Sequence, residues 1–218
     1  MKLLQIILLV ILLVILVVLC YLDNHRLNKE FYNISEVEPK LSILEDNYDI
    51  IKQEISELKQ NWINWPETEL YENDDWKIIP LYAFDTWVSK HKKYFKNTLN
   101  IVEKIPNVKT ILFSKLDGNT KIKPHQGWSK LSNNILRCHL PLIVGKDNYL
   151  GVENKKEYHK EGKLIIFDDS KLHYSVNNSD ITRIVLIIDI KRPYWIKKGK
   201  STVPDTPELH KIMEKYLK

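Results

Sequence analysis

The most apolar part of the chain is its first stretch. Residues 3–22 are almost wholly Leu, Ile and Val, with Gln5, Cys20 and Tyr21 as the polar exceptions. At about 1.5 Å per residue this stretch spans about 30 Å, the thickness of a bilayer's hydrocarbon core. A cleaved signal peptide has a shorter apolar run and a small-residue cleavage site, whereas no Ala, Gly or Ser interrupts this stretch. The pattern predicts an uncleaved transmembrane signal anchor over residues 1–22.

The next two segments differ in their apolar spacing. Residues 23–40 are polar and lack an apolar period, which predicts a stalk. After them, apolar residues recur at spacings of three and four, at Leu41, Leu44, Tyr48, Ile51, Ile55 and Leu58. This is one face of a helix of about 16–18 residues, which we expect to pack on the domain and do no chemistry. A second, weaker helical pattern covers 85–104 and stops before Pro106.

Beyond residue 106 the pattern changes to short runs that are rich in β-branched residues. The runs cover residues 108–116, 134–144, 163–169 and 182–193, with turn residues between them at 117–119, 145–148 and 177–178. Helices followed by strands at turn-rich spacing favour a β-sandwich or jelly roll supported by helices. We therefore expect one mainly β domain with supporting α-helices over 41–200, with its helical part over 41–105 and its strand core over 106–195.

The last residues, 201–218, predict a helical tail. Asp205 or Thr206 can cap a helix there, and Pro207 suits its first turn. Apart from the apolar first stretch, the chain has no internal repeat or low-complexity tract.

The net charge of +5 comes mainly from lysine. Acidic residues are interspersed among the basic ones and no long Lys/Arg block occurs, so we expect a solvated mixed-charge surface and no nucleic-acid partner. Cys20 lies in the predicted anchor and Cys138 in an apolar run, so we expect no disulfide. Arginine is rare, which makes each of its positions worth attention: Arg26, Arg137, Arg183 and Arg192.

Few features bear on the orientation of the anchor. Lys2 precedes the apolar stretch and Arg26 and Lys29 follow it, a charge bias too small to decide the orientation. Two segments fit the N-glycosylation pattern, Asn33-Ile34-Ser35 and Asn177-Asn178-Ser179. These two patterns tip the expected placement of the domain slightly toward the lumenal side.

Two arginines lie in apolar strands. Arg137 and His139 are two residues apart, so both point to one face of their strand, and Arg183 lies in a still more apolar run. A guanidinium in such a strand needs a carboxylate or phosphate partner. Two explanations stay open at this point: an anionic ligand in the mouth of the barrel, or buried ion pairs with Asp168, Asp169 or Asp189.

Three blocks of the sequence, in this order, resemble the aspartyl/asparaginyl β-hydroxylase family: "FSKLDGNTKIKPHQG", "LRCHLPL" and "EGKLIIFDDSKLHYSVNNSDITRIVLIIDIKRP". The resemblance covers about residues 41–195. It implies a double-stranded β-helix, which is a jelly-roll variant, and an oxygenase that uses Fe(II), 2-oxoglutarate and O₂.

The resemblance also implies the residues of the metal site. His125 and His173 are the expected iron ligands, and Gly127 stands where many non-haem iron oxygenases have a carboxylate ligand. Neutral imidazole suits Fe(II). We expect Asp168 and Asp169 to support the turn and orient the ligands, with a direct iron contact as the less favoured alternative.

Five further residues correspond to the cosubstrate pocket of the family. Arg183 matches the arginine that pairs with the distal carboxylate of 2-oxoglutarate, and Ser114 matches its hydroxyl partner. Arg137 and His139 match residues that line the rest of the pocket, and Trp76 matches a tryptophan at the same site. The remaining histidines lie in polar contexts, and we expect them to be exposed and without a role: His25, His91, His159 and His210.

These features favour a membrane-anchored dioxygenase that hydroxylates an aspartyl or asparaginyl residue of a protein or peptide. We expect its catalytic domain to be monomeric. One alternative is a hydroxylase of a lipid acyl chain, as in the lipid A hydroxylases; another is a non-catalytic, membrane-tethered binding module. The segment between His125 and Arg137 is longer than in the animal protein hydroxylases, and Trp128 and Lys130 within it border the expected substrate entrance. An apolar groove at Trp128 would favour lipid, and a basic cleft would favour an acidic peptide.

Overall fold

The computed structural model describes residues 2–24, 26–58, 62–83, 85–207 and 209–211. The chain divides into two compact units. The first consists of Met1–Asn28 and Pro193–Lys198, and the second of Lys29–Arg192 and Gly199–Lys218.

The first unit contains the apolar helix α1 (Lys2–Asn24). Its window Leu4–Tyr21 has a mean hydropathy of 3.3 and none of it is buried. By length and composition this helix is able to cross a membrane, and a signal sequence has the same properties. Leu27, just beyond the helix, forms a parallel β-bridge with Ile196 in the same unit.

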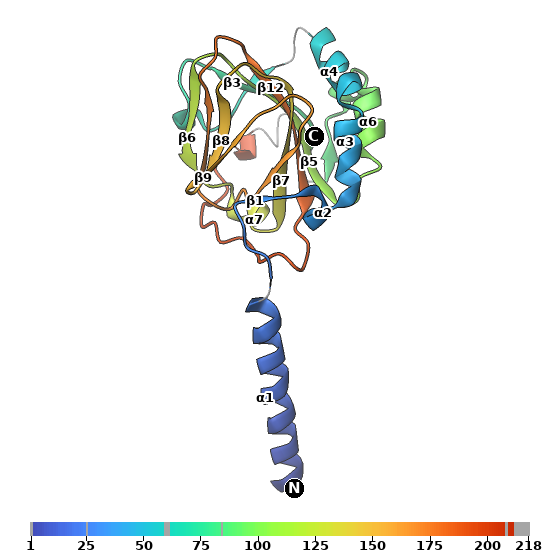
Figure 1. The fold of residues 1–218 in the computed structure, drawn as a ribbon, viewed down its shortest axis with the longest axis vertical. Coiled ribbons are helices and arrows are strands. Elements are labelled where there is room, and N and C mark those ends of the chain that lie inside the picture. The colour runs from blue at the N-terminus through green and yellow to red at the C-terminus, as the bar shows by residue number, and fades with distance from the viewer. Residues whose placement is uncertain (1, 25, 59–61, 84, 208, 212–218) are drawn as a thin grey trace. The chain divides into compact units, whose positions relative to one another are not determined.

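The second unit is built on two antiparallel β-sheets (Figure 1). The larger sheet has the order β1-β10-β7-β12-β5-β3-β2, with β4 paired to β3, and the smaller has the order β6-β11-β8-β9. Its strands are β1 (Phe31–Tyr32), β2 (Ile63–Asn64), β3 (Trp76–Ala83), β4 (Thr86–Trp87), β5 (Val108–Leu116), β6 (Thr120–His125), β7 (Ile135–Ile143), β8 (Asn148–Val152), β9 (Lys155–Tyr158), β10 (Ile165–Phe167), β11 (His173–Asn177) and β12 (Arg183–Lys191). The predicted mainly β, jelly-roll architecture is confirmed.

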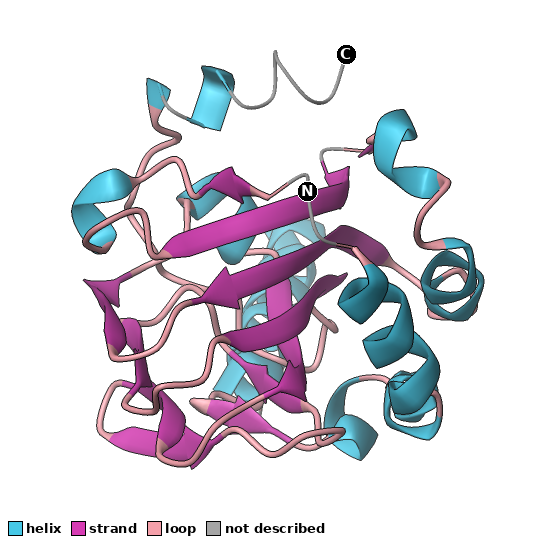
Figure 2. Cartoon of the chain, turned by 90° about the horizontal axis from the view of Figure 1, so that it is seen from above, coloured by secondary structure: helices cyan, strands magenta, loops and turns pink. Residues whose placement is uncertain are grey.

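Helices cover one face of the larger sheet (Figures 1 and 2). They include α3 (Ser42–Asp46), α4 (Tyr48–Glu57) and α6 (Lys96–Val102), and α4 contacts both α6 and β7. Shorter elements connect the rest: α2 (Ile34–Val37), η1 (Pro39–Leu41), η2 (Thr68–Leu70), α5 (Ser89–Lys92) and α7 (Ser129–Ser132).

The structure confirms the buried face of the helix that the apolar spacing predicts after residue 40. The helix itself is not continuous, because it is divided into α3 and α4. Leu41, Leu44, Ile51 and Ile55 are all buried, as the spacing requires. The helix breaks at Asn47, whose side-chain amide donates to the carbonyl of Ile43 at 2.8 Å. An asparagine that bonds nearby backbone in this way competes with the helical ladder.

The prediction of one helix over 85–104 is wrong. That segment holds β4 and two short helices, α5 and α6. The sequence pattern also missed β3, because Pro80 lies inside it and a proline removes one donor from the ladder. The ladder between β3 and β5 shifts register just after Pro80, which accommodates the missing donor.

The predicted stalk ends earlier than residue 40. Phe31 and Tyr32 pair with β10, and Tyr32 is buried. In the tail, the Thr206 hydroxyl accepts from the Leu209 N–H at 3.2 Å, as expected of a helix cap. The predicted helical residues 212–218 lie outside the described residues, as does His25.

Candidate active site

His125 and His173 lie side by side on neighbouring strands of the smaller sheet. His125 ends β6, His173 begins β11, and the two are register partners with ring centroids 4.2 Å apart. The Nδ1 of His125 lies 2.8 Å from the Lys123 carbonyl, and that of His173 lies 2.9 Å from the Lys171 carbonyl. A carbonyl only accepts, so each Nδ1 carries the proton and each Nε2 keeps a lone pair for a metal.

Both imidazoles are neutral at physiological pH. Burial lowers the pKa of His125 to about 3, with the neighbouring His173 as a second cause. Burial likewise lowers the pKa of His173 to about 4. Metal binding requires the neutral form, so neither ring must lose a proton before it becomes a ligand.

Asp169 stands beside this pair. Its Oδ1 lies 3.5 Å from the Nε2 of His173, and its backbone carbonyl accepts from the Gly127 N–H at 2.9 Å. A Cβ at position 127 would lie 1.9 Å from the Asp169 carboxylate. Gly127 therefore makes room for the carboxylate of Asp169, which follows strand β10. Within the described residues, no group of three or more His, Cys, Asp or Glu side chains has the arrangement of a metal site, so the candidate is a two-histidine pair.

Arg137 is neutralised by two carboxylates. Its Nε and Nη2 donate to the two oxygens of Asp189 at 2.8 and 2.9 Å, and its Nη1 donates to Asp169 at 2.6 Å. Burial raises the pKa of Asp169 while the guanidinium opposes that rise. At 2.6 Å from a guanidinium we treat Asp169 as ionised. The ion-pair explanation thus describes Arg137, which the resemblance had assigned to the cosubstrate pocket.

Asp168 is held by Arg192 and Ser170. It accepts from two nitrogens of Arg192, at 2.8 and 2.5 Å, and from the Ser170 hydroxyl at 2.6 Å. Of the two neighbouring aspartates, only Asp169 lies at the candidate metal site.

Arg183 has no such counter-charge. It is only 1% exposed, and its Nη1 donates to the hydroxyl of Ser175. Its Nε has no partner in the described part of the chain, and no carboxylate there lies within ion-pair distance. Burial lowers the pKa of Arg183 to about 10, with no charged neighbour as a further cause. The alternative of an ion pair with Asp189 is therefore wrong for Arg183, because Asp189 is bound to Arg137.

Two buried histidines lie near Arg183. His139 and His159 have ring centroids 5.9 Å apart, and all four of their ring nitrogens lack a partner among the described residues. Burial lowers the pKa of both rings well below 6.5, and the positive charge of Arg183 adds to this for each. The expectation that His159 is exposed is wrong, as is the same expectation for His91, whose Nδ1 lies 2.7 Å from the Pro80 carbonyl.

Trp76 and Ser114 bind each other. The indole N–H of Trp76 donates to the Ser114 hydroxyl at 3.0 Å, and the ring lies 6.3 Å from that of His125. Both residues therefore lie by the predicted site, but the hydroxyl bonded to Arg183 is that of Ser175. The alternation of β11 could have revealed Ser175, since it shares a strand face with His173.

A stack of tryptophans extends from Trp76. Trp65 stacks on it at 4.4 Å, and Trp128 stacks on Trp65 at 5.6 Å. The indole N–H groups of Trp65 and Trp128 both donate to Glu67, at 3.2 and 2.9 Å, and burial raises the pKa of this carboxyl. Trp128 is buried, and Lys130 pairs with Asp205 at 2.7 Å. Trp128 thus donates a hydrogen bond to an acid and stacks on another tryptophan. These contacts form neither the apolar groove expected for a lipid nor the basic cleft expected for an acidic peptide.

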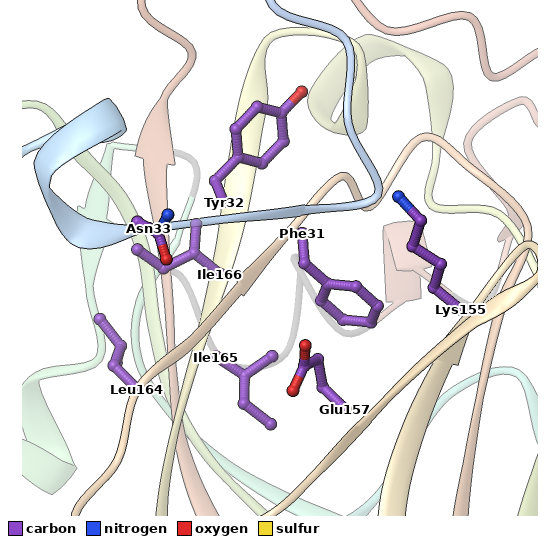
Figure 3. Close-up of a pocket in the computed structure, with 8 residues that line it drawn as sticks. All are labelled: Phe31, Tyr32, Asn33, Lys155, Glu157, Leu164, Ile165 and Ile166. Atoms are coloured by element: carbon purple, nitrogen blue, oxygen red, sulfur yellow. The ribbon is translucent and has the colours of Figure 1, made fainter.

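A cavity of about 360 Å³ lies between β1, β9 and β10 (Figure 3). Lys155 and Glu157 face Leu164 and Ile165 across it (Figure 3). Its lining consists of Phe31, Tyr32, Asn33, Lys155, Glu157, Leu164, Ile165 and Ile166. Ile165 is the register partner of His139, so the cavity adjoins the strand that carries this histidine. None of the predicted site residues lines the cavity.

Comparison with known proteins gives matches to hydroxylases. A family model described as aspartyl/asparaginyl beta-hydroxylase matches residues 45–193. An ornithine lipid ester-linked acyl 2-hydroxylase of Rhizobium tropici is 36% identical over 121 residues, which are 54% of this chain and 42% of that protein. The human aspartyl/asparaginyl beta-hydroxylase is 28% identical over 170 residues, 74% of this chain and 22% of that protein. The chain thus matches less than half the length of either relative.

Solved structures with a similar fold include two oxygenases. An oxidoreductase of the 2OG-Fe(II) oxygenase family from Burkholderia pseudomallei has a TM-score of 0.49 at 10% identity, covering 73% of this chain and 82% of that one. A prolyl-4-hydroxylase of Pseudomonas putida has a TM-score of 0.45 at 10% identity, covering 70% and 99%. Neither likeness bears on the reaction or the substrate.

Proposed function

The chain belongs to the aspartyl/asparaginyl β-hydroxylase family, and on that premise we propose that it is a membrane-anchored, Fe(II)- and 2-oxoglutarate-dependent dioxygenase that acts as a hydroxylase. One observation carries the proposal. A pair of neutral, oriented histidines lies on β6 and β11, and β11 also carries Ser175, the hydroxyl partner of Arg183, a buried arginine with no carboxylate within ion-pair distance among the described residues.

The residues present fit Fe(II). His125 and His173 each have Nδ1 engaged by a backbone carbonyl, which orients the ring and leaves Nε2 as the donor atom. Two imidazoles are borderline ligands of the kind that Fe(II) accepts. The Oδ1 of Asp169, held by Arg137, lies 3.5 Å from the Nε2 of His173, beside the place that a metal on Nε2 would take.

The residues present also fit a dicarboxylate. A buried guanidinium with an unpartnered Nε costs several kcal/mol unless an anion joins it, about 3–5 kcal/mol for an uncompensated buried charge. Arg183 offers a planar fork for one carboxylate, and the Ser175 hydroxyl and the neutral His139 and His159 offer hydrogen bonds beside it. We assign His159, Ser175 and Ser114 to this pocket together with Arg183, His139 and Trp76.

The chain's own residues bind, orient and exclude water. Fe(II) and 2-oxoglutarate, when bound, together supply the activation of O₂ for hydroxylation of a C–H bond, with succinate and CO₂ as the other products. Arg183 fixes the far end of the cosubstrate, and the two histidines fix the metal. Phe167 contacts both His139 and His173, at 5.1 and 5.3 Å between ring centroids, and so keeps the space between the two subsites apolar.

For the substrate we propose an aspartyl or asparaginyl residue of a protein or peptide, on the strength of the family match over residues 45–193. A lipid acyl chain is the second candidate. It is supported by the 36% identity to an acyl 2-hydroxylase and by the exposed apolar helix α1.

We propose that α1 remains attached as a single-pass anchor. The lumenal placement now depends on Asn33 alone, which is exposed. Asn177 is fully buried and its amide donates to three backbone carbonyls, those of Leu116, Asp117 and Ile181. A glycan on Asn177 would break this network, so the second pattern is not usable in the folded protein.

The test uses the full chain in detergent with Fe(II) and 2-oxoglutarate. Succinate should form, and a peptide pool or extracted lipids should gain 16 Da, the mass of one oxygen; the pool that gains it identifies the substrate class. His125→Ala and His173→Ala should abolish succinate formation while the protein stays folded. Undiminished succinate formation in both variants would refute the assignment of the metal site.

A further inference from the structure

The segment Pro193–Lys198 is tied by its backbone to the chain just beyond α1. The N–H of Leu27 donates to the Trp195 carbonyl at 2.9 Å, and the N–H of Lys197 donates to the Leu27 carbonyl at 2.8 Å. Together these bonds form the parallel bridge between Leu27 and Ile196. The segment and α1 belong to the same compact unit.

The covalent chain limits how far this segment lies from the end of the helix. Leu27 is three residues past Asn24, the last residue of α1, and three residues span at most about 11 Å. The headgroup layer extends about 5–8 Å beyond each side of the hydrocarbon core. If α1 crosses a bilayer, the segment is therefore held within about 11 Å of the end of the helix, in the headgroup layer or just outside it.

The side chains of the segment suit that level. Tyr194 is 79% exposed and Trp195 is 43% exposed, with their rings edge to face at 5.0 Å, while Ile196 is buried. Exposed tyrosine and tryptophan are characteristic of the membrane–water interface. Lys197 and the exposed Lys198 follow them directly, and a lysine near an anionic surface strengthens binding about fivefold.

We propose that Pro193–Lys198 is a second membrane contact, in which Tyr194 and Trp195 enter the headgroup layer and Lys197 and Lys198 bind anionic headgroups. This inference rests on the proposed anchor. The segment follows β12, the strand of Arg183, after a single intervening residue, so the contact tethers the catalytic unit to the bilayer at a second point of the chain.

The first experiment locates Trp195. The full chain is reconstituted in nanodiscs of phosphatidylcholine with phosphatidylserine, with lipids brominated near the headgroup as the quencher. Trp195→Phe should lose most of the lipid-dependent quenching of tryptophan fluorescence. Trp87→Phe, which changes a partly buried tryptophan of the other unit, should keep it. Equal quenching in the wild type and both variants would overturn the contact.

The second experiment tests the lysines and does not depend on the fold of a tryptophan variant. Quenching in the wild type should increase when phosphatidylserine is added to phosphatidylcholine discs. Lys197→Gln with Lys198→Gln should lose most of that increase, whereas Lys104→Gln with Lys160→Gln, two exposed lysines elsewhere, should retain it. An equal response in the two double variants would contradict the proposal. If neither the wild type nor any variant entered the discs, and mass spectrometry showed that α1 had been removed, the anchor would be refuted instead.

Discussion

Arg137 and Arg183 come from neighbouring strands of one sheet, yet their surroundings are opposite. Arg137 on β7 donates to both oxygens of Asp189 and to Asp169. Arg183 on β12 donates to the Ser175 hydroxyl and has no carboxylate within ion-pair distance in the described structure. One guanidinium is neutralised by the protein, and the other leaves its charge for a ligand to neutralise.

The difference separates a structural arginine from a binding one. A buried ion pair with satisfied hydrogen bonds holds strands in register and leaves no capacity for a further anion. An uncompensated buried cation is unfavourable for the fold by itself, and proteins keep such groups at sites where a ligand completes them. Arg137 therefore holds Asp169 beside the Nε2 of His173, and we propose that Arg183 anchors the cosubstrate.

The largest expected effect is a contrast between two identical substitutions. Arg137→Met leaves Asp169 and Asp189 buried without their cation, which should lower the free energy of unfolding by about 3–5 kcal/mol. Arg183→Met removes a buried charge that has no counter-charge among the described residues, so the free energy of unfolding should fall by less than about 1 kcal/mol and is expected to rise. Urea denaturation of both variants without metal or cosubstrate measures this. A similar loss of stability in both would remove the distinction between the two arginines.

A smaller effect is expected at Gly127. A Cβ there would lie 1.9 Å from the Asp169 carboxylate, so Gly127→Ala must displace the acid that binds Arg137. Overpacking of this kind costs about 1–3 kcal/mol. The variant should show this loss in thermal denaturation and bind Fe(II) more weakly.

Gly145→Ala is the control for this prediction, because its Cβ would crowd Ser179, at 2.1 Å from Oγ and 2.5 Å from Cβ, without meeting Asp169. It should lose stability and keep the iron affinity of the wild type. Wild-type stability and iron affinity in Gly127→Ala would show that Asp169 does not support the metal site.

The smallest effect concerns pH. Burial and Arg183 lower the pKa of His159 well below 6.5, so the folded protein keeps this ring neutral while the unfolded chain takes up a proton below about pH 6.5. The unfolded state then binds more protons, and stability falls as pH falls, by about 1.4 kcal/mol per pH unit for each such histidine. In His159→Phe, the free energy of unfolding should fall less steeply between pH 6.5 and 5.5, by the contribution of one histidine. An unchanged slope would place a proton on His159 in the folded state.

The central strands of the larger sheet were predictable because their sequence carries the signal locally, whereas no predicted run covers β6, β8, β9 or β11 of the smaller sheet. The run 108–116 coincides with β5, and the run 182–193 contains β12, since β-branched residues bounded by turns favour strands. The strand β3 was not predictable, because Pro80 interrupts the same kind of run. The two candidate iron ligands came from family resemblance, and the register of β6 with β11 places them together.

The partners of the arginines could not be read from the sequence. Asp189 reaches Arg137 from 52 positions away through the register of β7 with β12, and Asp168 turns to Arg192 although its neighbour Asp169 turns to Arg137. His159 gave no signal either, since Glu157, Lys160 and Glu161 surround it in the sequence and only the fold buries it. Such pairings depend on strand order, which local patterns do not encode.

We propose that Arg183 binds the distal carboxylate of 2-oxoglutarate. Arg183→Lys keeps the positive charge and removes the planar fork, and a hydrogen bond to a charged group contributes about 1.5–3 kcal/mol. The decisive measurement is the affinity for 2-oxoglutarate by calorimetry, with Mn(II) in place of Fe(II), together with the free energy of unfolding of the same variant. We expect an affinity about 10–100-fold weaker, with the free energy of unfolding changed by less than about 1 kcal/mol. Normal affinity together with a large loss of stability would contradict it.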